Sequence, residues 1–212
     1  MRTLIFSDVH GNLPAFEKML DHVGVCDLYI SLGDLVDFGP WSNECVDLAM
    51  SLPNNVQIMG NHEQDYINGY HSGPNKLADC FFETTFSSFK RFDEISSFKD
   101  NFNFDKYKCQ HTLNNENIYP DTKISLDNNY LIGHSHHQFH YKNNGFELYN
   151  SGSVGQNRKY INICNYLIFD SDTNFMESHE LHYDIDIVIQ EMRSQKYPQV
   201  CINYYSEKQR KV

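Results

Sequence analysis

The chain has no long hydrophobic run and no paired-cysteine motif. Its apolar stretches stay well below the roughly 18 residues of a membrane-spanning helix. The apolar segment near Met1 is too short for a signal peptide. Six cysteines are present, but none forms a C-x-x-C pair, which argues against a cysteine zinc site. We therefore expect reduced cysteines, a cytoplasmic location and no membrane partner.

Positive charge is scarce. Lysine and arginine total 17 against 28 aspartate and glutamate residues, so the formal net charge is −11. A negative field of this kind repels a nucleic-acid backbone at long range, so we expect no stable binding of nucleic acid. A phosphate-bearing substrate is still compatible with this charge, because bound metal ions reverse its sign locally.

Linkers, internal repeats and low-complexity tracts are absent as well. A length of 212 residues suits one domain, and 14% aromatic residues supply apolar surface for a core. We expect a single domain over residues 1–212. The sequence leaves the oligomeric state open.

The first third of the chain repeats a pattern in which a short apolar run ends in polar residues and a helical pattern follows. The expected strands cover residues 3–6, 28–32 and 56–59, and helices are expected to begin near Pro14 and Ser42. Such units indicate a layered α/β fold. Their polar loops follow the carboxyl ends of the strands, so we expect them to converge on one rim.

Residues 75–98 have a helical spacing of apolar side chains, and we expect the aromatic ones to pack in the core. The second half then returns to strands. We expect strands at 102–109, 130–132 and 147–150, a hairpin of 166–170 and 175–182, a helix at 185–194, and a frayed charged tail at 207–211.

Side chains that bind metals follow five of these strands: Asp8, His10, Asp34, Asn61, His62, His111, His134 and His136. Asp8 and His10 are alternate residues, so we expect them to project the same way from an extended segment. Oxygen and imidazole ligands together suit divalent Mn, Fe or Zn, whereas carboxylates alone would indicate Mg²⁺ or Ca²⁺. The candidates exceed what one tetrahedral ion needs, and two ions that share a carboxylate would use them all.

As an ordered set, these pieces closely resemble the calcineurin-like metallophosphoesterase superfamily, over residues 1 to about 170. The segments GDLVDFGPWSNECVDL and NSGSVGQNR are similar to its small bacterial phosphodiesterase type. The matching motifs are Asp8-Val9-His10, Gly33-Asp34-Leu35-Val36-Asp37, Gly60-Asn61-His62-Glu63, His111 and Gly133-His134-Ser135-His136.

The resemblance implies a four-layer α-β-β-α sandwich, in which two mixed sheets pack face to face with helices outside. It also implies roles for residues. Asp34 would bridge two metal ions, His62 would be the catalytic histidine near the leaving-group oxygen, and Asp37 would support the site without binding metal. The remaining ligands would be Asp8, His10 and His136 for the first ion and Asn61, His111 and His134 for the second.

The implied activity is that of a binuclear-metal phosphoesterase, in which a metal-bridging hydroxide attacks phosphorus directly. The substrate would be a small phosphodiester or phosphomonoester, or a nucleotide. The two metal ions would be manganese, with iron, zinc or nickel as alternatives. A protein Ser/Thr phosphatase or a dinucleoside-tetraphosphate hydrolase stays open. A non-catalytic scaffold of the same fold is disfavoured, because the sequence keeps every ligand and His62.

The sequence departs from the family pattern at two positions: Thr112 follows His111 where glycine is common, and Asn157 precedes Arg158 where proline is usual. Arg158 is a candidate for pairing with a phosphate oxygen, and a structural salt bridge is the alternative. His137 is a second candidate for contact with the substrate. His137 and His140 extend the histidine cluster, and an exposed position is the alternative for both.

Overall fold

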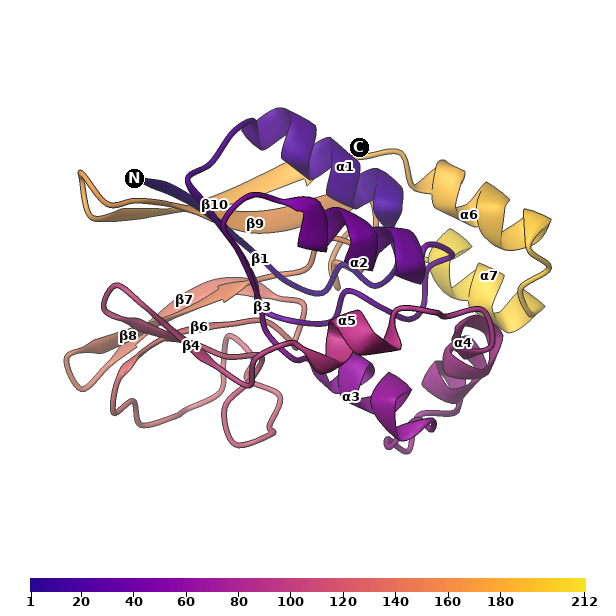
Figure 1. The fold of residues 1–212 in the computed structure, drawn as a ribbon, viewed down its shortest axis with the longest axis horizontal. Coiled ribbons are helices and arrows are strands. Elements are labelled where there is room, and N and C mark those ends of the chain that lie inside the picture. The colour runs from indigo at the N-terminus through magenta and orange to yellow at the C-terminus, as the bar shows by residue number, and fades with distance from the viewer.

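The computed structural model describes residues 1–212 and contains two mixed five-stranded sheets flanked by helices (Figure 1). The α/β sandwich expected from the sequence is confirmed. In the first sheet the strand order is β10 (Phe175–His182), β9 (Ile163–Asp170), β1 (Arg2–Phe6), β2 (Leu28–Ser31) and β3 (Asn55–Gln57). In the second sheet the order is β4 (Phe102–Phe104), β5 (Tyr107–Cys109), β6 (Asn129–Ile132), β8 (Phe146–Ser151) and β7 (Gln138–Asn143).

Seven helices accompany the sheets. They are α1 (Leu13–Val23), α2 (Ser42–Ser51), α3 (Asn61–Asn68), α4 (Lys76–Phe86), α5 (Phe92–Ser96), α6 (Ile185–Ser194) and α7 (Gln199–Ser206). Figure 1 shows α1 and α2 over the strands β1 and β9, with the second sheet on the opposite side. None of the helices combines the length and apolar composition that crossing a membrane requires.

Strand β1 is buried on both faces, and its side chains alternate between two cores. Leu4 and Phe6 belong to the larger apolar cluster, which includes the side chains beneath the helices. Ile5 belongs to a second cluster that contains Leu131 of β6 and therefore lies between the two sheets. A period of two sends successive side chains to opposite faces of a sheet, which is why this uninterrupted apolar run supports both cores.

The loops of the site meet because parallel strands end at the same edge of each sheet. Strands β1, β2 and β3 are parallel neighbours, and so are β5, β6 and β8. The backbone N–H of Val154, after β8, donates to the carbonyl of Ser7, after β1, at 3.0 Å. This hydrogen bond joins the rims of the two sheets, and the polar segments of both halves of the chain share one edge.

Four features of the fold differ from the expectations. The helix expected at 75–98 is two helices, α4 and α5. The chain turns between them at Ser88, which bonds back to the carbonyl of Thr85, and at Lys90, whose N–H donates to Asn43. The strand expected at 102–109 is a β4–β5 hairpin with a left-handed turn residue, Asp105 (φ 50°). Strand β7 and helix α7 were not expected.

The tail expected to fray at 207–211 is instead held against the rest of the chain. The carbonyl of Gln209 accepts a hydrogen bond from the N–H of Ile161 at 2.9 Å. Both terminal nitrogens of Arg210 bond the carboxylate of Asp186 on α6, at 2.9 and 2.6 Å. The charge of the tail suggested solvation, but the Arg210 side chain has a partner on α6 and the backbone of Gln209 has one on the loop before β9.

Candidate metal centre

Five of the seven candidate ligands have left-handed backbones. The φ values are 55° at Asp8, 50° at His10, 59° at Asp34, 67° at His134 and 58° at His136. Such values are uncommon outside glycine and cluster at functional sites. The expectation that Asp8 and His10 project from an extended segment is therefore wrong. Their side chains converge because the backbone turns at each of these residues.

Two glycines let the backbone approach the candidate ligands. A Cβ at Gly60 would collide with the carboxylate and backbone N of Asp34, and a Cβ at Gly133 would collide with the side chains of Ser7 and Asp8. Glycine is required at both positions because no other residue leaves this space free. The Gly-Asn-His-Glu and Gly-His-Ser-His motifs thus begin with glycine for a steric reason.

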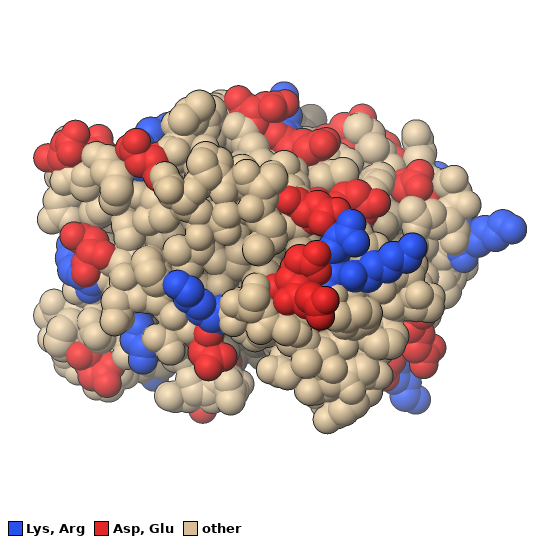
Figure 2. Space-filling model, in the orientation of Figure 1, with Lys and Arg blue, Asp and Glu red and all other residues tan.

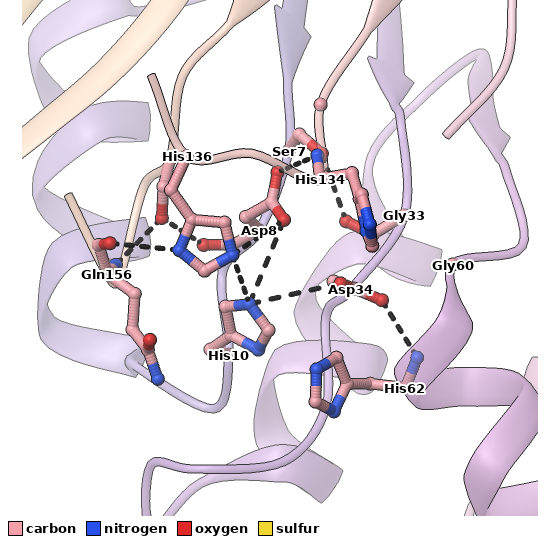
Figure 3. A network of polar contacts seen from close by, with 12 residues as sticks. Ser7, Asp8, His10, Gly33, Asp34, Gly60, His62, His134, His136 and Gln156 are labelled. Atoms are coloured by element: carbon pink, nitrogen blue, oxygen red, sulfur yellow. Dashed lines mark hydrogen bonds and ion pairs between the residues drawn. The ribbon is translucent and has the colours of Figure 1, made fainter. Parts of the chain in front are cut away.

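Asp8, His10 and His136 form a first cluster of ligand atoms (Figure 3). Asp8 Oδ1 lies 3.1 Å from His136 Nε2 and 3.8 Å from His10 Nε2, and these two nitrogens lie 3.1 Å apart. The Nδ1 atoms of His10 and His136 donate to the backbone carbonyls of Val36 and Gln156. Each ring therefore directs its second nitrogen toward Asp8.

Asn61, His111 and His134 form a second cluster. His111 Nε2 lies 3.1 Å from both Asn61 Oδ1 and His134 Nδ1, and the last two atoms are 2.8 Å apart. His111 Nδ1 donates to the carbonyl of Leu32 at 2.7 Å, which fixes the orientation of the ring. Thr112 in place of the family's usual glycine therefore does not displace His111 from the cluster.

Asp34 lies between the two clusters. Its Oδ2 is 3.1 Å from His111 Nε2 and 3.9 Å from His10 Nε2, while its Oδ1 accepts the N–H of His62 at 3.0 Å. The carboxylate is almost fully buried, with 1% of the residue exposed. It is the group that is placed to contact an ion in either cluster.

The chemistry of these side chains fits bound cations. Asp8 Oδ1 is buried and accepts no hydrogen bond, although a buried carboxylate oxygen without a partner is costly. Burial lowers the pKa values of His10 and His136, so their Nε2 atoms carry lone pairs rather than protons. Ionised carboxylate and neutral imidazole are the forms in which these side chains bind metals.

Protonation of His111 and Asp34 follows the same electrostatics. Burial favours the neutral form of His111, but Asp34 and Asp8 outweigh it and raise the pKa of His111 to about 10. Burial would raise the pKa of Asp34, but His111 and His62 hold it well below its usual range. A cation bound at the second cluster would replace the proton of His111 in this charge balance.

His62 lies beside the clusters and is held by Asp37. Its Nδ1 is 2.8 Å from Asp37 Oδ2, and its ring packs edge-on against those of His10 and Phe38. Burial would lower the pKa of His62, but the carboxylates of Asp34 and Asp37 outweigh it and raise the pKa to about 9. Because Nδ1 is engaged by Asp37, the proton available for transfer is the one on Nε2.

Glu63 fixes the loop that carries Asp34, a role that sequence reasoning did not assign. Its carboxylate accepts the N–H groups of Asp34, Leu35, Val36 and Gly60, at distances from 2.6 to 3.3 Å. The signal was present in the sequence. Glu63 lies three positions after Gly60, the residue before α3, and an acidic residue at this position often accepts the backbone N–H groups at the start of a helix.

The two candidates for substrate contact occupy the edge of the site. Arg158 is exposed and makes no ion pair; its Nη1 donates to the hydroxyl oxygen of Tyr204 at 3.0 Å. His137 is half-buried and lines a cavity of about 350 Å³ together with His136. His140 is directed elsewhere, because its ring stacks on Tyr149 at 3.9 Å and its Nε2 lies 3.2 Å from Glu147.

A second cavity, of about 620 Å³, opens beside Asn61, His111 and His134. Its walls are almost entirely polar and include amide side chains from several elements, and its one hydrophobic residue is Met59. A polar molecule that enters this cavity reaches the second cluster directly.

Comparison with known proteins identifies the family of the chain. The family model for calcineurin-like phosphoesterases matches residues 1–189. An uncharacterized protein of Methanocaldococcus jannaschii, MJ0912, is 27% identical over an alignment that covers 92% of this chain and 93% of that protein. The chain therefore spans nearly the full length of this relative.

Two solved structures have the same fold over nearly the whole chain. A metallophosphoesterase from Sphaerobacter thermophilus has a TM-score of 0.82 at 25% identity and covers 97% of this chain and 98% of its own. A hypothetical protein from Pyrococcus horikoshii OT3, PH1004, has a TM-score of 0.79 at 15% identity over 96% and 97% of the two chains. Given the family match over residues 1–189, the chain belongs to the calcineurin-like phosphoesterase family and is a metal-dependent phosphoester hydrolase.

Proposed function

We propose that the chain hydrolyses phosphate esters at a centre of two divalent metal ions within one domain. Asp8, His10 and His136 would hold one ion, and Asn61, His111 and His134 the other, with Asp34 between them. The observation that supports this most strongly is the first cluster, where the unpartnered Oδ1 of Asp8 faces two lone-pair nitrogens within 3.8 Å. Oxygen and nitrogen donors together suit divalent manganese, iron, zinc or nickel, and we propose manganese.

The ions, when bound, supply a nucleophilic water at neutral pH and neutralise charge on the phosphate oxygens. The chain supplies the proton for the leaving group. His62 carries it on Nε2, and the Asp37 carboxylate at Nδ1 fixes the tautomer and the orientation of the ring. The carboxylates of Asp34 and Asp37 raise the pKa of His62 to about 9, so the ring keeps this proton at neutral pH.

The substrate we propose is a small phosphate ester or a nucleotide, either a diester or a monoester. The polar cavity beside the second cluster supports a substrate with hydrogen-bonding groups. On the face shown in Figure 2, most lysine and arginine side chains lie next to acidic ones, which supports the expectation of no stable nucleic-acid binding. All six cysteines are free, in keeping with the cytoplasmic location that we propose.

The test is a metal-screened assay of bis-p-nitrophenyl phosphate and p-nitrophenyl phosphate with the wild type, His62→Ala and His140→Ala. We expect activity that requires added metal, is lost in His62→Ala and is retained in His140→Ala, because His140 is bound to Tyr149 and Glu147 away from the centre. Hydrolysis that persists in a chelator and in His62→Ala would refute the proposal.

A further inference from the structure

The hydroxyl of Tyr204 lies between two cationic side chains. Arg158 Nη1 and Lys208 Nζ donate to its oxygen at 3.0 and 2.8 Å, and the ammonium also lies 4.1 Å from the centre of the ring. The hydroxyl in turn donates to Gln156 Oε1 at 3.1 Å. A phenol oxygen has one proton and two lone pairs, so this arrangement uses all of its hydrogen-bonding capacity.

No carboxylate neutralises this pair. Arg158 and Lys208 make no ion pair, whereas Arg91 and Arg210 each bond a carboxylate, of Asp47 and Asp186. Lys208 is half-buried, and burial together with the neighbouring Arg158 lowers the pKa of its ammonium to about 8. The repulsion between the two cations and the burial of Lys208 cost free energy that a bound anion would recover.

A single residue, Gln156, connects Tyr204 and its two cations to the first cluster. Gln156, which accepts from Tyr204, also accepts the Nδ1 proton of the ligand His136 through its backbone carbonyl at 3.0 Å. The Tyr204 ring packs on Phe38 at 6.2 Å, and Phe38 packs on His10 at 5.0 Å. These side chains separate Tyr204 from the ligand atoms. We therefore infer that an anion held at Arg158 and Lys208 is a group other than the phosphate at the centre.

Two of these three side chains lie beyond the segment that the family model matches, which ends at residue 189. Tyr204 belongs to α7 and Lys208 to the tail. Helix α7 is held by the packing of Tyr204 and Tyr205 on Phe81 of α4. The C-terminal segment therefore adds a positive, positioned group to a centre that the rest of the chain builds.

We propose that Arg158, Tyr204 and Lys208 form a subsite for a second anionic group of the substrate, a phosphate on the part of the molecule that lies on the His136 side of the centre. This inference rests on the proposed function. Arginine supplies a planar pair of donors and lysine a point charge, and both suit phosphate oxygens. The hydroxyl of Tyr204 holds the two cations at a fixed separation until the phosphate binds.

The experiment compares two esters that differ in one phosphate: thymidine 5′-(p-nitrophenyl phosphate) and the same compound with a 3′-phosphate. Both release p-nitrophenol, so a single readout gives kcat/KM for each with manganese present. We expect kcat/KM to be at least about tenfold higher for the 3′-phosphorylated ester, the size of one charge-assisted contact. Inhibition by thymidine 3′,5′-bisphosphate, compared with thymidine 5′-monophosphate, measures the same preference without a variant.

The variants are Lys208→Met, Lys208→Arg and Lys18→Met, each checked by its thermal midpoint. Lys208→Met should bring the preference close to one. Lys208→Arg keeps the positive charge and should keep most of the preference for the 3′-phosphorylated ester. Lys18→Met removes an exposed charge on α1 and should leave this preference unchanged. Equal kcat/KM for the two esters in the wild type, or a preference that survives Lys208→Met, would overturn the subsite. Failure to hydrolyse these two esters and p-nitrophenyl phosphate alike would instead remove the proposed function.

Discussion

The Nε2 atoms of His10 and His136 face each other at 3.1 Å, while the Nδ1 atom of each ring donates to a backbone carbonyl. A carbonyl only accepts, so each Nδ1 carries the proton and each Nε2 presents a lone pair. Two lone pairs at this distance repel each other unless a cation lies between them. The fold thus holds ligands in an arrangement that a bound ion stabilises.

Metal binding should therefore stabilise the folded chain. An ion that binds only the folded state adds about 2.7 kcal/mol of unfolding free energy at a concentration of 100 times its Kd. Differential scanning calorimetry with manganese and with a chelator measures the effect. We expect a higher thermal midpoint with manganese, and His10→Ala should reduce the gain. A midpoint that is the same in both conditions would contradict metal binding at these residues.

Asp34→Asn should reduce kcat by about 10²–10³-fold, because the variant removes the negative charge that both clusters share. Metal analysis of the purified variant should show fewer bound ions than in the wild type. Asp172→Asn, at an exposed carboxylate that pairs with the chain terminus, is the control and should behave as the wild type does. Full activity in Asp34→Asn would remove this residue from the centre.

Asp37→Asn should shift the alkaline limb of the pH–kcat profile to lower pH. Asp34 and Asp37 hold the pKa of His62 above its ordinary value of 6.5, and the amide removes one of these two charges. The pKa of His62 then falls, so the proton that the leaving group needs is lost at a lower pH. Bound cations would lower the pKa of His62 in the wild type and in Asp37→Asn alike. The two pH profiles are therefore compared at the same metal concentration, where the difference between their alkaline limbs remains.

Asp79→Asn is the matched control for this profile, because Asp79 also bonds a histidine, His71, but outside the two clusters. Its alkaline limb should coincide with that of the wild type. If the limb of Asp37→Asn coincides as well, His62 is not the group that donates the proton.

Glu63→Gln should destabilise the chain by about 2–3 kcal/mol, because the amide nitrogen would face N–H donors that the carboxylate now accepts. Chemical denaturation measures the loss, with Glu83→Gln, an exposed residue of α4, as the control. We expect weaker metal binding in the same variant, since Glu63 fixes the backbone of Asp34. Unchanged unfolding would mean that this network contributes little.

The sequence predicted the convergence of the site because strand ends and motifs are local signals. An apolar run that ends in Asp8 or Asp34 marks a strand and its loop, and parallel strands bring such loops to one edge. All seven candidate ligands lie in the two clusters or between them. The left-handed backbone at Asp8 and His10 was missed, because φ > 0 is uncommon outside glycine and no local sequence pattern marks it at these two residues.

Long-range contacts account for the remaining differences. The break between α4 and α5 depends on Asn43 of α2, which accepts the N–H of Lys90, and no pattern within residues 75–98 reports this contact. The tail looked solvated by composition, but Asp186 and Ile161 hold it. The positions of Tyr204 and Lys208 also depend on tertiary packing, and the periodicity of apolar residues did not predict them.

The central claim is that the two clusters hold a pair of ions that share Asp34. A crystal structure of the protein grown with manganese, with anomalous scattering recorded at the manganese edge, tests it most directly. We predict two anomalous peaks about 3.5–4 Å apart, both within bonding distance of the Asp34 carboxylate. A single peak, peaks that do not contact Asp34, or no peak at saturating manganese would contradict the account.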